Sequence, residues 1–97
     1  MEAQVLTKHP EGKKGVNILK RRYELVKDTI LGVLNEKGEL TFTELVSECS
    51  KRLRKTLDGK PAWYVVTVKL DLEARRMVER VPKTRPQRIK LLKSKKR

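Results

Sequence analysis

The sequence has few of the residues that support metal binding or a disulfide-stabilised fold. It contains one cysteine and one histidine among 97 residues, and aromatic residues make up 4%. One cysteine excludes a disulfide within the chain and a multi-cysteine zinc site, and one histidine excludes a histidine-rich metal cluster. No apolar run approaches the roughly 20 residues that cross a membrane, and no signal-peptide pattern opens the chain. We therefore expect one small soluble, cytoplasmic domain without a cofactor or a metal.

Acidic residues are scarce relative to basic ones. The chain has 25 Lys and Arg against 12 Asp and Glu, so its formal net charge is +13. Residues 80–97 hold nine of the basic residues and no acidic one. Charge concentrated in this way favours a polyanionic partner, nucleic acid before an anionic membrane surface. The alternative is a solvated tail that aids solubility.

The first helical pattern follows a polar N-terminal segment. Residues 1–16 contain glycine and proline, and His9-Pro10-Glu11-Gly12 predicts a turn, so we expect a flexible lead-in. Asn17 is a residue type that caps helices, and Gly38 suits a helix C-terminus. Between them, apolar residues recur at steps of three and four, which predicts a helix over 17–37. These residues are Leu19, Tyr23, Val26, Ile30, Val33 and Leu34.

A second helix is predicted over residues 42–54. Thr41 and Glu44 have the spacing of a capping box, and an apolar stripe follows them. Leu40, just before the cap, is expected to form a strand of one or two residues. Cys49 belongs to the apolar stripe, so we interpret it as a buried core residue rather than a reactive thiol.

A third helix, predicted over 61–76, carries two apolar stripes. Pro61 suits its first turn. One stripe consists of Trp63, Val66, Leu70 and Ala74; the other consists of Val65, Val68 and Leu72. A polar edge lies between them, made of Lys60, Tyr64, Thr67, Asp71 and Arg75. A helix that is apolar on two sides is usually covered on both. We therefore expect Trp63, Val66 and Leu70 to form a homodimer interface; the alternative is that residues 3–18 fold back over Trp63.

The last part of the chain predicts a basic β-hairpin. Two β-prone runs, 77–81 and 87–92, flank five residues that have a proline at each end. Alternation would point Ile89 and Leu91 inward and Arg88 and Lys90 outward. Residues 93–97 are expected to be a disordered basic tail.

The order helix, short strand, helix, helix, basic hairpin resembles a winged helix-turn-helix domain, an α+β fold, over residues 17–92. More locally, Trp63-Tyr64 followed by the stretch from Thr67 to Arg75 resembles a family of short microbial winged-helix proteins with a T-V-x-L-D-L-E-A-K/R motif. That family usually has a glycine before the wing, whereas this chain has Arg76.

In the helix-turn-helix geometry the third helix lies in the major groove of DNA and the wing contacts phosphates or the minor groove. The candidate contacts on the helix are Lys60, Tyr64 and Thr67, and those on the wing are Lys83, Arg85, Arg88 and Lys90. We therefore expect a small transcriptional regulator that binds double-stranded DNA. Two alternatives stay open: a winged-helix protein-interaction module without sequence-specific DNA binding, and an RNA- or ribosome-associated basic protein.

The sequence shows no catalytic constellation. It has no nucleophile–base pair, no metal-ligand spacing and no glycine-rich phosphate loop. Its carboxylates fall singly along the helices, and we interpret them as solvated partners of residues four positions away. We therefore expect neither an enzyme nor a small-molecule substrate.

Overall fold

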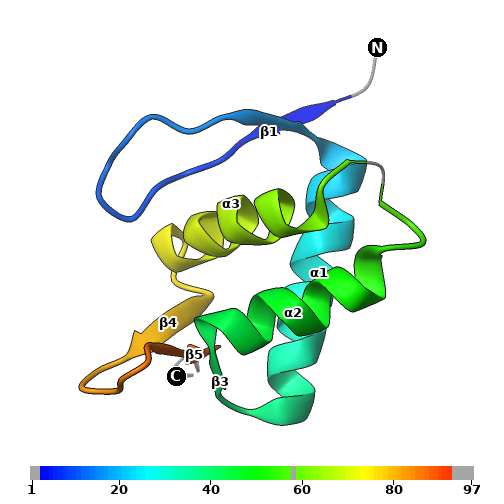
Figure 1. Ribbon diagram of the computed structural model, residues 1–97. Helices are drawn as coiled ribbons and strands as arrows, with labels where there is room; N and C mark the ends of the chain where they lie inside the picture. The colour runs from blue at the N-terminus through cyan, green and yellow to red at the C-terminus, as the bar shows by residue number, and fades with distance from the viewer. Residues whose placement is uncertain (1–2, 58, 93–97) are drawn as a thin grey trace, which may run out of the picture.

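The computed structural model describes residues 3–57 and 59–92, which form three helices and two antiparallel sheets (Figure 1). The elements follow one another as β1 (Gln4–Leu6), β2 (Asn17–Leu19), α1 (Lys20–Lys37), β3 (Leu40–Thr41), α2 (Phe42–Leu53), α3 (Pro61–Ala74), β4 (Val78–Val81) and β5 (Arg88–Leu91). The expected small α+β domain with three helices and antiparallel strands is confirmed. The predicted basic tail, 93–97, lies outside the described residues.

The N-terminal segment contains a β-hairpin that was not predicted from the sequence. β1 pairs with β2 in antiparallel register, with Val5 opposite Ile18. The prediction of a helix that starts at Ile18 and is capped by Asn17 is therefore wrong. Asn17 and Ile18 belong to β2, where their extended backbone pairs with β1, and α1 begins only at Lys20 after Leu19.

The predicted capping box of the second helix is confirmed. The backbone N–H of Glu44 donates to the Thr41 hydroxyl over 3.1 Å, and the backbone N–H of Thr41 donates to the Glu44 carboxylate over 2.9 Å. The short strand expected at Leu40 is also present as β3. The helix end expected at Gly38 is confirmed, since its backbone has a φ of 81° and its N–H donates to the Leu34 carbonyl over 2.8 Å.

The C-terminal hairpin is confirmed and belongs to a three-stranded sheet. β4 pairs with β5 from Val78 opposite Leu91 to Val81 opposite Arg88. β5 also pairs with β3, so the strand order is β3-β5-β4. Ile89, in the central strand, is fully buried, which agrees with its expected inward orientation.

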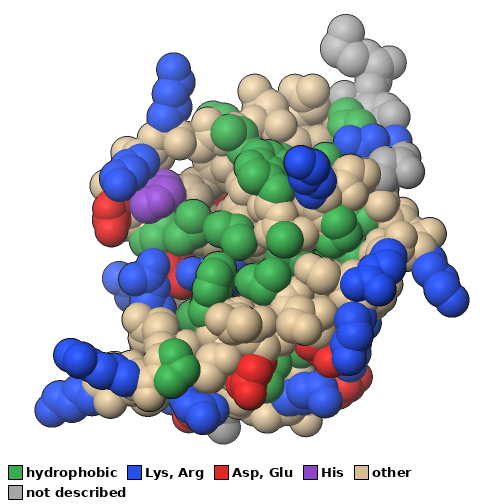
Figure 2. All heavy atoms as spheres, viewed as in Figure 1, with side chains coloured by type: hydrophobic (Ala, Val, Ile, Leu, Met, Phe, Trp, Pro, Cys, Tyr) green, Lys and Arg blue, Asp and Glu red, His purple; other side chains and the backbone are tan. Residues whose placement is uncertain are grey.

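The loop between β1 and β2 lies alongside α3, on the side of that helix away from α2 (Figure 1). The chain therefore does fold back toward the outward face of α3. It does not cover that face completely, because hydrophobic side chains remain visible over α3 (Figure 2). Trp63 keeps 49% of its surface exposed.

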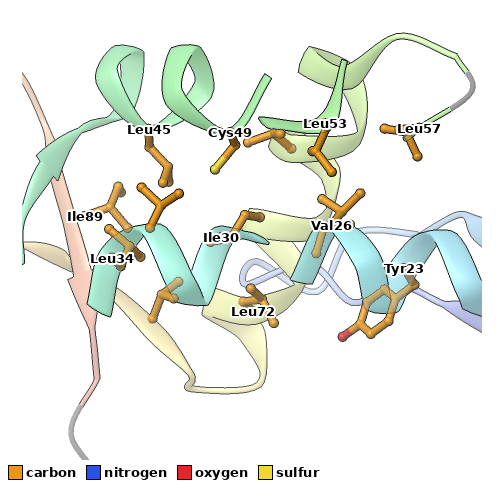
Figure 3. Close-up of a cluster of buried hydrophobic side chains, with 14 of the residues drawn as sticks. Tyr23, Val26, Ile30, Leu34, Leu45, Cys49, Leu53, Leu57, Leu72 and Ile89 are labelled. Carbon is orange, nitrogen blue, oxygen red and sulfur yellow. The ribbon is translucent and has the colours of Figure 1, made fainter. Parts of the chain in front are cut away.

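The core lies between α1, α2 and the inner face of α3, and β5 closes one end of it (Figure 3). Full burial of one such aliphatic side chain stabilises the fold by about 1.5–3 kcal/mol. Cys49 lies among these side chains, and burial raises the pKa of its thiol to about 12. Its interpretation as a core residue is confirmed. Among the described helices, none is long and apolar enough to span a bilayer.

Candidate functional site

One residue of the polar edge of α3, Asp71, faces the interior instead of solvent, whereas Lys60 and Arg75 at the ends of this edge are exposed. Asp71 is fully buried and accepts hydrogen bonds from the backbone N–H of Lys8 over 2.8 Å and from the Arg75 guanidinium over 2.9 Å. The Tyr23 hydroxyl of α1 also donates to this carboxylate. Burial, together with the bond to Asp71, raises the pKa of Tyr23 well above its usual value. This edge therefore connects α3 to α1 and to the N-terminal hairpin.

Two of the three residues expected to contact DNA from α3 have other neighbours. The Tyr64 hydroxyl accepts a hydrogen bond from the Arg22 guanidinium over 3.0 Å. Thr67 is half-buried and lines a groove of about 190 Å³ between α3 and the β1–β2 loop. Lys60 is exposed at the residue that caps α3. Of the three side chains, that of Lys60 is therefore the most accessible to a ligand.

The outward face of α3 is apolar. Ala62 and Trp63 are exposed on it, and Val66 and Leu70 are half-buried. The Trp63 and Tyr64 rings meet edge to face with their centroids 5.0 Å apart. In the space-filling view, hydrophobic side chains gather in a band over this helix, and Lys and Arg side chains lie around the band (Figure 2). An exposed apolar face of this kind is typical of an interaction site, and it offers few hydrogen-bonding groups to base edges.

The flank of α3 that faces α2 and the sheet holds a buried ion pair. Lys69 donates to Glu73 over 2.8 Å, and both side chains are 7% exposed. The Lys69 ammonium also lies 4.9 Å from the centre of the Phe42 ring, and Glu73 accepts from Arg80 of β4 over 3.2 Å. The interpretation of the carboxylates as solvated is wrong for Asp71 and Glu73, because neighbouring elements cover both. The sequence signal for these pairs is the four-residue spacing of Asp71 from Arg75 and of Glu73 from Lys69.

The tip of the β4–β5 hairpin presents two free cations. Lys83 and Arg85 are exposed, and neither forms an ion pair with a described residue. Thr84 shapes the tip, since its hydroxyl donates to the Val81 carbonyl over 2.9 Å and accepts from the backbone N–H of Arg88 over 3.1 Å. The tip is therefore a defined turn that carries two cations available to a phosphate.

The other two cations predicted on this hairpin have acidic neighbours. Lys90 pairs with Glu79 across the strands, over 3.5 Å. Arg88 is half-buried and its charge acts on Glu44. The pKa of that carboxyl is lowered, first by its bond with the Thr41 backbone and also by Arg88. The structure thus distinguishes two exposed cations at the tip from Lys90, which is paired with Glu79, and from half-buried Arg88, which lies near Glu44.

Within the described part of the chain, no group of three or more His, Cys, Asp or Glu side chains could hold a metal ion. His9 lies in the β1–β2 loop, where its Nδ1 atom accepts the backbone N–H of Glu11 over 3.1 Å.

Comparison with known proteins relates most of the chain to one protein family. Residues 4–89 match a family described as "Family of unknown function (DUF6958)". No curated protein and no solved structure matches the chain.

Proposed function

The chain belongs to the DUF6958 family of unknown function, and we propose that it is a small winged-helix protein that binds duplex DNA through the phosphate backbone. In this proposal the β4–β5 hairpin is the wing and supplies the main contacts.

The order of elements supports the winged-helix assignment. From α1 onward the chain runs helix, short strand, helix, helix, hairpin. The short strand β3 pairs with the second hairpin strand, so that β5 lies in the middle of the sheet. The separate β1–β2 hairpin is an addition at the N-terminal side of this arrangement.

The observation that carries the proposal is the free pair Lys83 and Arg85 at the hairpin tip. A Lys or Arg that neutralises a DNA phosphate releases a counterion from the DNA, and this release favours binding. A cation without an acidic partner has no ion pair to give up when it contacts the phosphate. Residues 80–97 contain no acidic residue that would oppose a phosphate. Contacts of this kind position a protein on DNA without reading its sequence.

Sequence-specific contacts between α3 and the base edges of DNA have less support than phosphate contacts made by the wing. Tyr64 is bonded to Arg22, and Thr67 lies beside the N-terminal hairpin. Lys60, at the exposed start of α3, is suited to a phosphate rather than to a base edge. We therefore propose that binding discriminates weakly between DNA sequences.

A salt titration of binding tests this function. Anisotropy of a labelled duplex of about 20 base pairs is measured with the natural chain and with the double variant Lys83→Gly/Arg85→Gln. Glycine suits position 83, where φ is 62°, so the fold is expected to remain intact. We expect about tenfold weaker binding and a salt slope that is less steep by about 0.9 for each lost contact.

The matched control removes two charges elsewhere. Arg54 and Lys55 are exposed beyond the C-terminal end of α2, at the end of that helix away from the β4–β5 hairpin (Figure 1). Arg54→Gln/Lys55→Gln is expected to change the affinity much less than the wing variant. Equal losses in the two variants, or an unchanged affinity in the first, would contradict the proposal. Tighter binding of single-stranded RNA than of the duplex would instead favour an RNA-associated role.

A further inference from the structure

The exposed apolar surface of this protein is concentrated around α3 and the N-terminal hairpin. Among the described residues, the large hydrophobic side chains with much exposed surface are Leu6 at 60%, Val16 at 40% and Trp63 at 49%. Val16 and Trp63 line the same groove, together with Leu70. A contiguous apolar patch with a polar border is typical of an interaction site.

The wall of this groove opposite α3 is fixed in position. The Thr7 hydroxyl accepts the backbone N–H of Val16 over 3.0 Å, and the Thr7 N–H donates to the Val16 carbonyl over 2.9 Å. At Gly15 the two sides of the hairpin approach so closely that a Cβ atom would lie 1.8 Å from the Thr7 carbonyl oxygen. The backbone of Lys8 is bonded to buried Asp71. The groove is therefore formed before a partner binds, which lowers the entropic cost of binding.

The border of the groove is positively charged. Lys8 and Lys14 line the groove from the β1–β2 loop, and Lys60 is exposed at the start of α3, three residues before Trp63. Within the described part of the chain, no Asp or Glu lines this groove. The nearby Glu11 is paired with Lys13 over 3.4 Å. A second copy of this chain would bring a net charge of +13 to the same border, whereas an acidic partner would gain from it.

The shape of the patch fits a helix. α3 has 14 residues, which corresponds to a length of about 21 Å. Trp63, Val66 and Leu70 follow one another at three and four residues, so they form a straight row along that length. A row of this kind can pack along the apolar stripe of a second helix, whose own anchors recur at three and four residues.

We propose that the groove between α3 and the N-terminal hairpin binds an acidic amphipathic helix of another protein. The apolar stripe of that helix packs on Trp63 and Leu70, and its carboxylates pair with Lys8, Lys14 and Lys60. This surface is distinct from the tip of the wing, so the main phosphate contacts, Lys83 and Arg85, lie outside it. Lys60 is the side chain that both proposals use.

The single tryptophan provides a direct readout. The probe is a synthetic 18-residue helix with leucine on one face and glutamate on the other, titrated into the full chain while Trp63 emission is recorded. We expect a blue shift with a micromolar dissociation constant. A peptide with lysine in place of glutamate is expected to bind at least tenfold more weakly. No shift at millimolar peptide, or equal binding of the two peptides, would overturn the proposal.

Variants separate this surface from the wing. Lys8→Glu/Lys14→Glu is expected to weaken peptide binding at least tenfold, while Arg54→Glu/Lys55→Glu, with the same change of charge, leaves it within about twofold. Lys83→Gly/Arg85→Gln is expected to bind the peptide like the natural chain, so failure of DNA binding and failure of peptide binding can be told apart.

Two further results would assign the groove to another occupant and overturn the proposal. One is a two-chain mass in sedimentation at micromolar protein, with Trp63 emission shifted by self-association. The other is a blue shift of Trp63 on addition of duplex DNA together with loss of peptide binding, which would place the groove in the DNA interface.

Discussion

The backbone N–H of Lys8 donates to the carboxylate of Asp71 over 2.8 Å, across 63 positions of the sequence. Asp71 is fully buried and also binds the side chains of Tyr23 and Arg75. One carboxylate therefore joins the N-terminal hairpin, α1 and α3. The position of the groove wall beside Trp63 depends on this junction.

Asp71→Asn tests the junction. The amide keeps the shape of the side chain but loses the charge that faces Arg75 and the Lys8 N–H. We expect the free energy of unfolding to fall by about 1–3 kcal/mol, because the donors of Tyr23 and Lys8 lose a charged acceptor while Arg75 is partly solvated. Urea denaturation measures this change, and exposed Asp28→Asn, the control, is expected to stay within about 0.5 kcal/mol. If Asp71→Asn unfolds with the same free energy as the natural chain, the hydrogen bonds to Asp71 do not stabilise the fold.

Alkaline pH is expected to destabilise the fold through Tyr23. Its pKa is higher in the folded chain than the usual value of about 10, so its contribution to stability is complete below that pH and is lost as the pH rises further. Unfolding free energies measured between pH 8 and 11.5 are therefore expected to decline above about pH 10. In Tyr23→Phe this decline is expected to be smaller; an identical decline in both chains would exclude Tyr23 as its source.

Arg76→Gly is expected to stabilise the protein. Arg76 has a φ of 64°, in the left-handed region that costs a residue with a side chain about 1 kcal/mol or more. We expect the melting temperature to rise by about 4–8 °C for a gain of about 1 kcal/mol. Arg54, with a φ of −54°, provides the control, because glycine there relieves no strain and is expected to lower stability. A lower melting temperature for Arg76→Gly would contradict the argument.

Gly15→Ala and Gly32→Ala are expected to act in opposite directions. At Gly15 the new methyl group would collide with the Thr7 carbonyl, so we expect a loss of more than about 2 kcal/mol or an opened hairpin. At Gly32, on the exposed side of α1, nothing lies within 4 Å, and alanine is expected to add about 0.5–1 kcal/mol. Thermal unfolding of both variants measures the difference. A similar stability for both would show that the close approach at Thr7 relaxes without cost.

The helices could be predicted from the sequence because their signals are local. The capping box at Thr41 and Glu44 and the three- and four-residue spacing of apolar residues mark α1 and α2 without reference to the rest of the chain. β1 and β2 have three residues each, which is too short for an alternating pattern, and their pairing joins Val5 to Ile18 across a long loop. Pairing of this kind depends on tertiary contacts that no local pattern contains.

The candidate site could be predicted only in part, because local patterns assign residues to faces of a helix but do not contain its tertiary contacts. Periodicity correctly placed Trp63, Val66 and Leu70 on one face of α3 and Asp71 on another. It could not show which neighbour covers each face, so the polar edge was expected to be exposed. The hairpin whose loop covers Asp71 was itself missing from the prediction. The positions of Lys83 and Arg85 at a turn followed from the two prolines, which are local signals.

The central position of β5 has a consequence for the protein during its synthesis. β3 and β4 are not paired with each other, and each bonds only to β5 in their sheet. A ribosome makes Arg88–Leu91 after both of these strands. Until those four residues emerge, a nascent chain carries two strands with open edges and lacks the Ile89 side chain that closes the core.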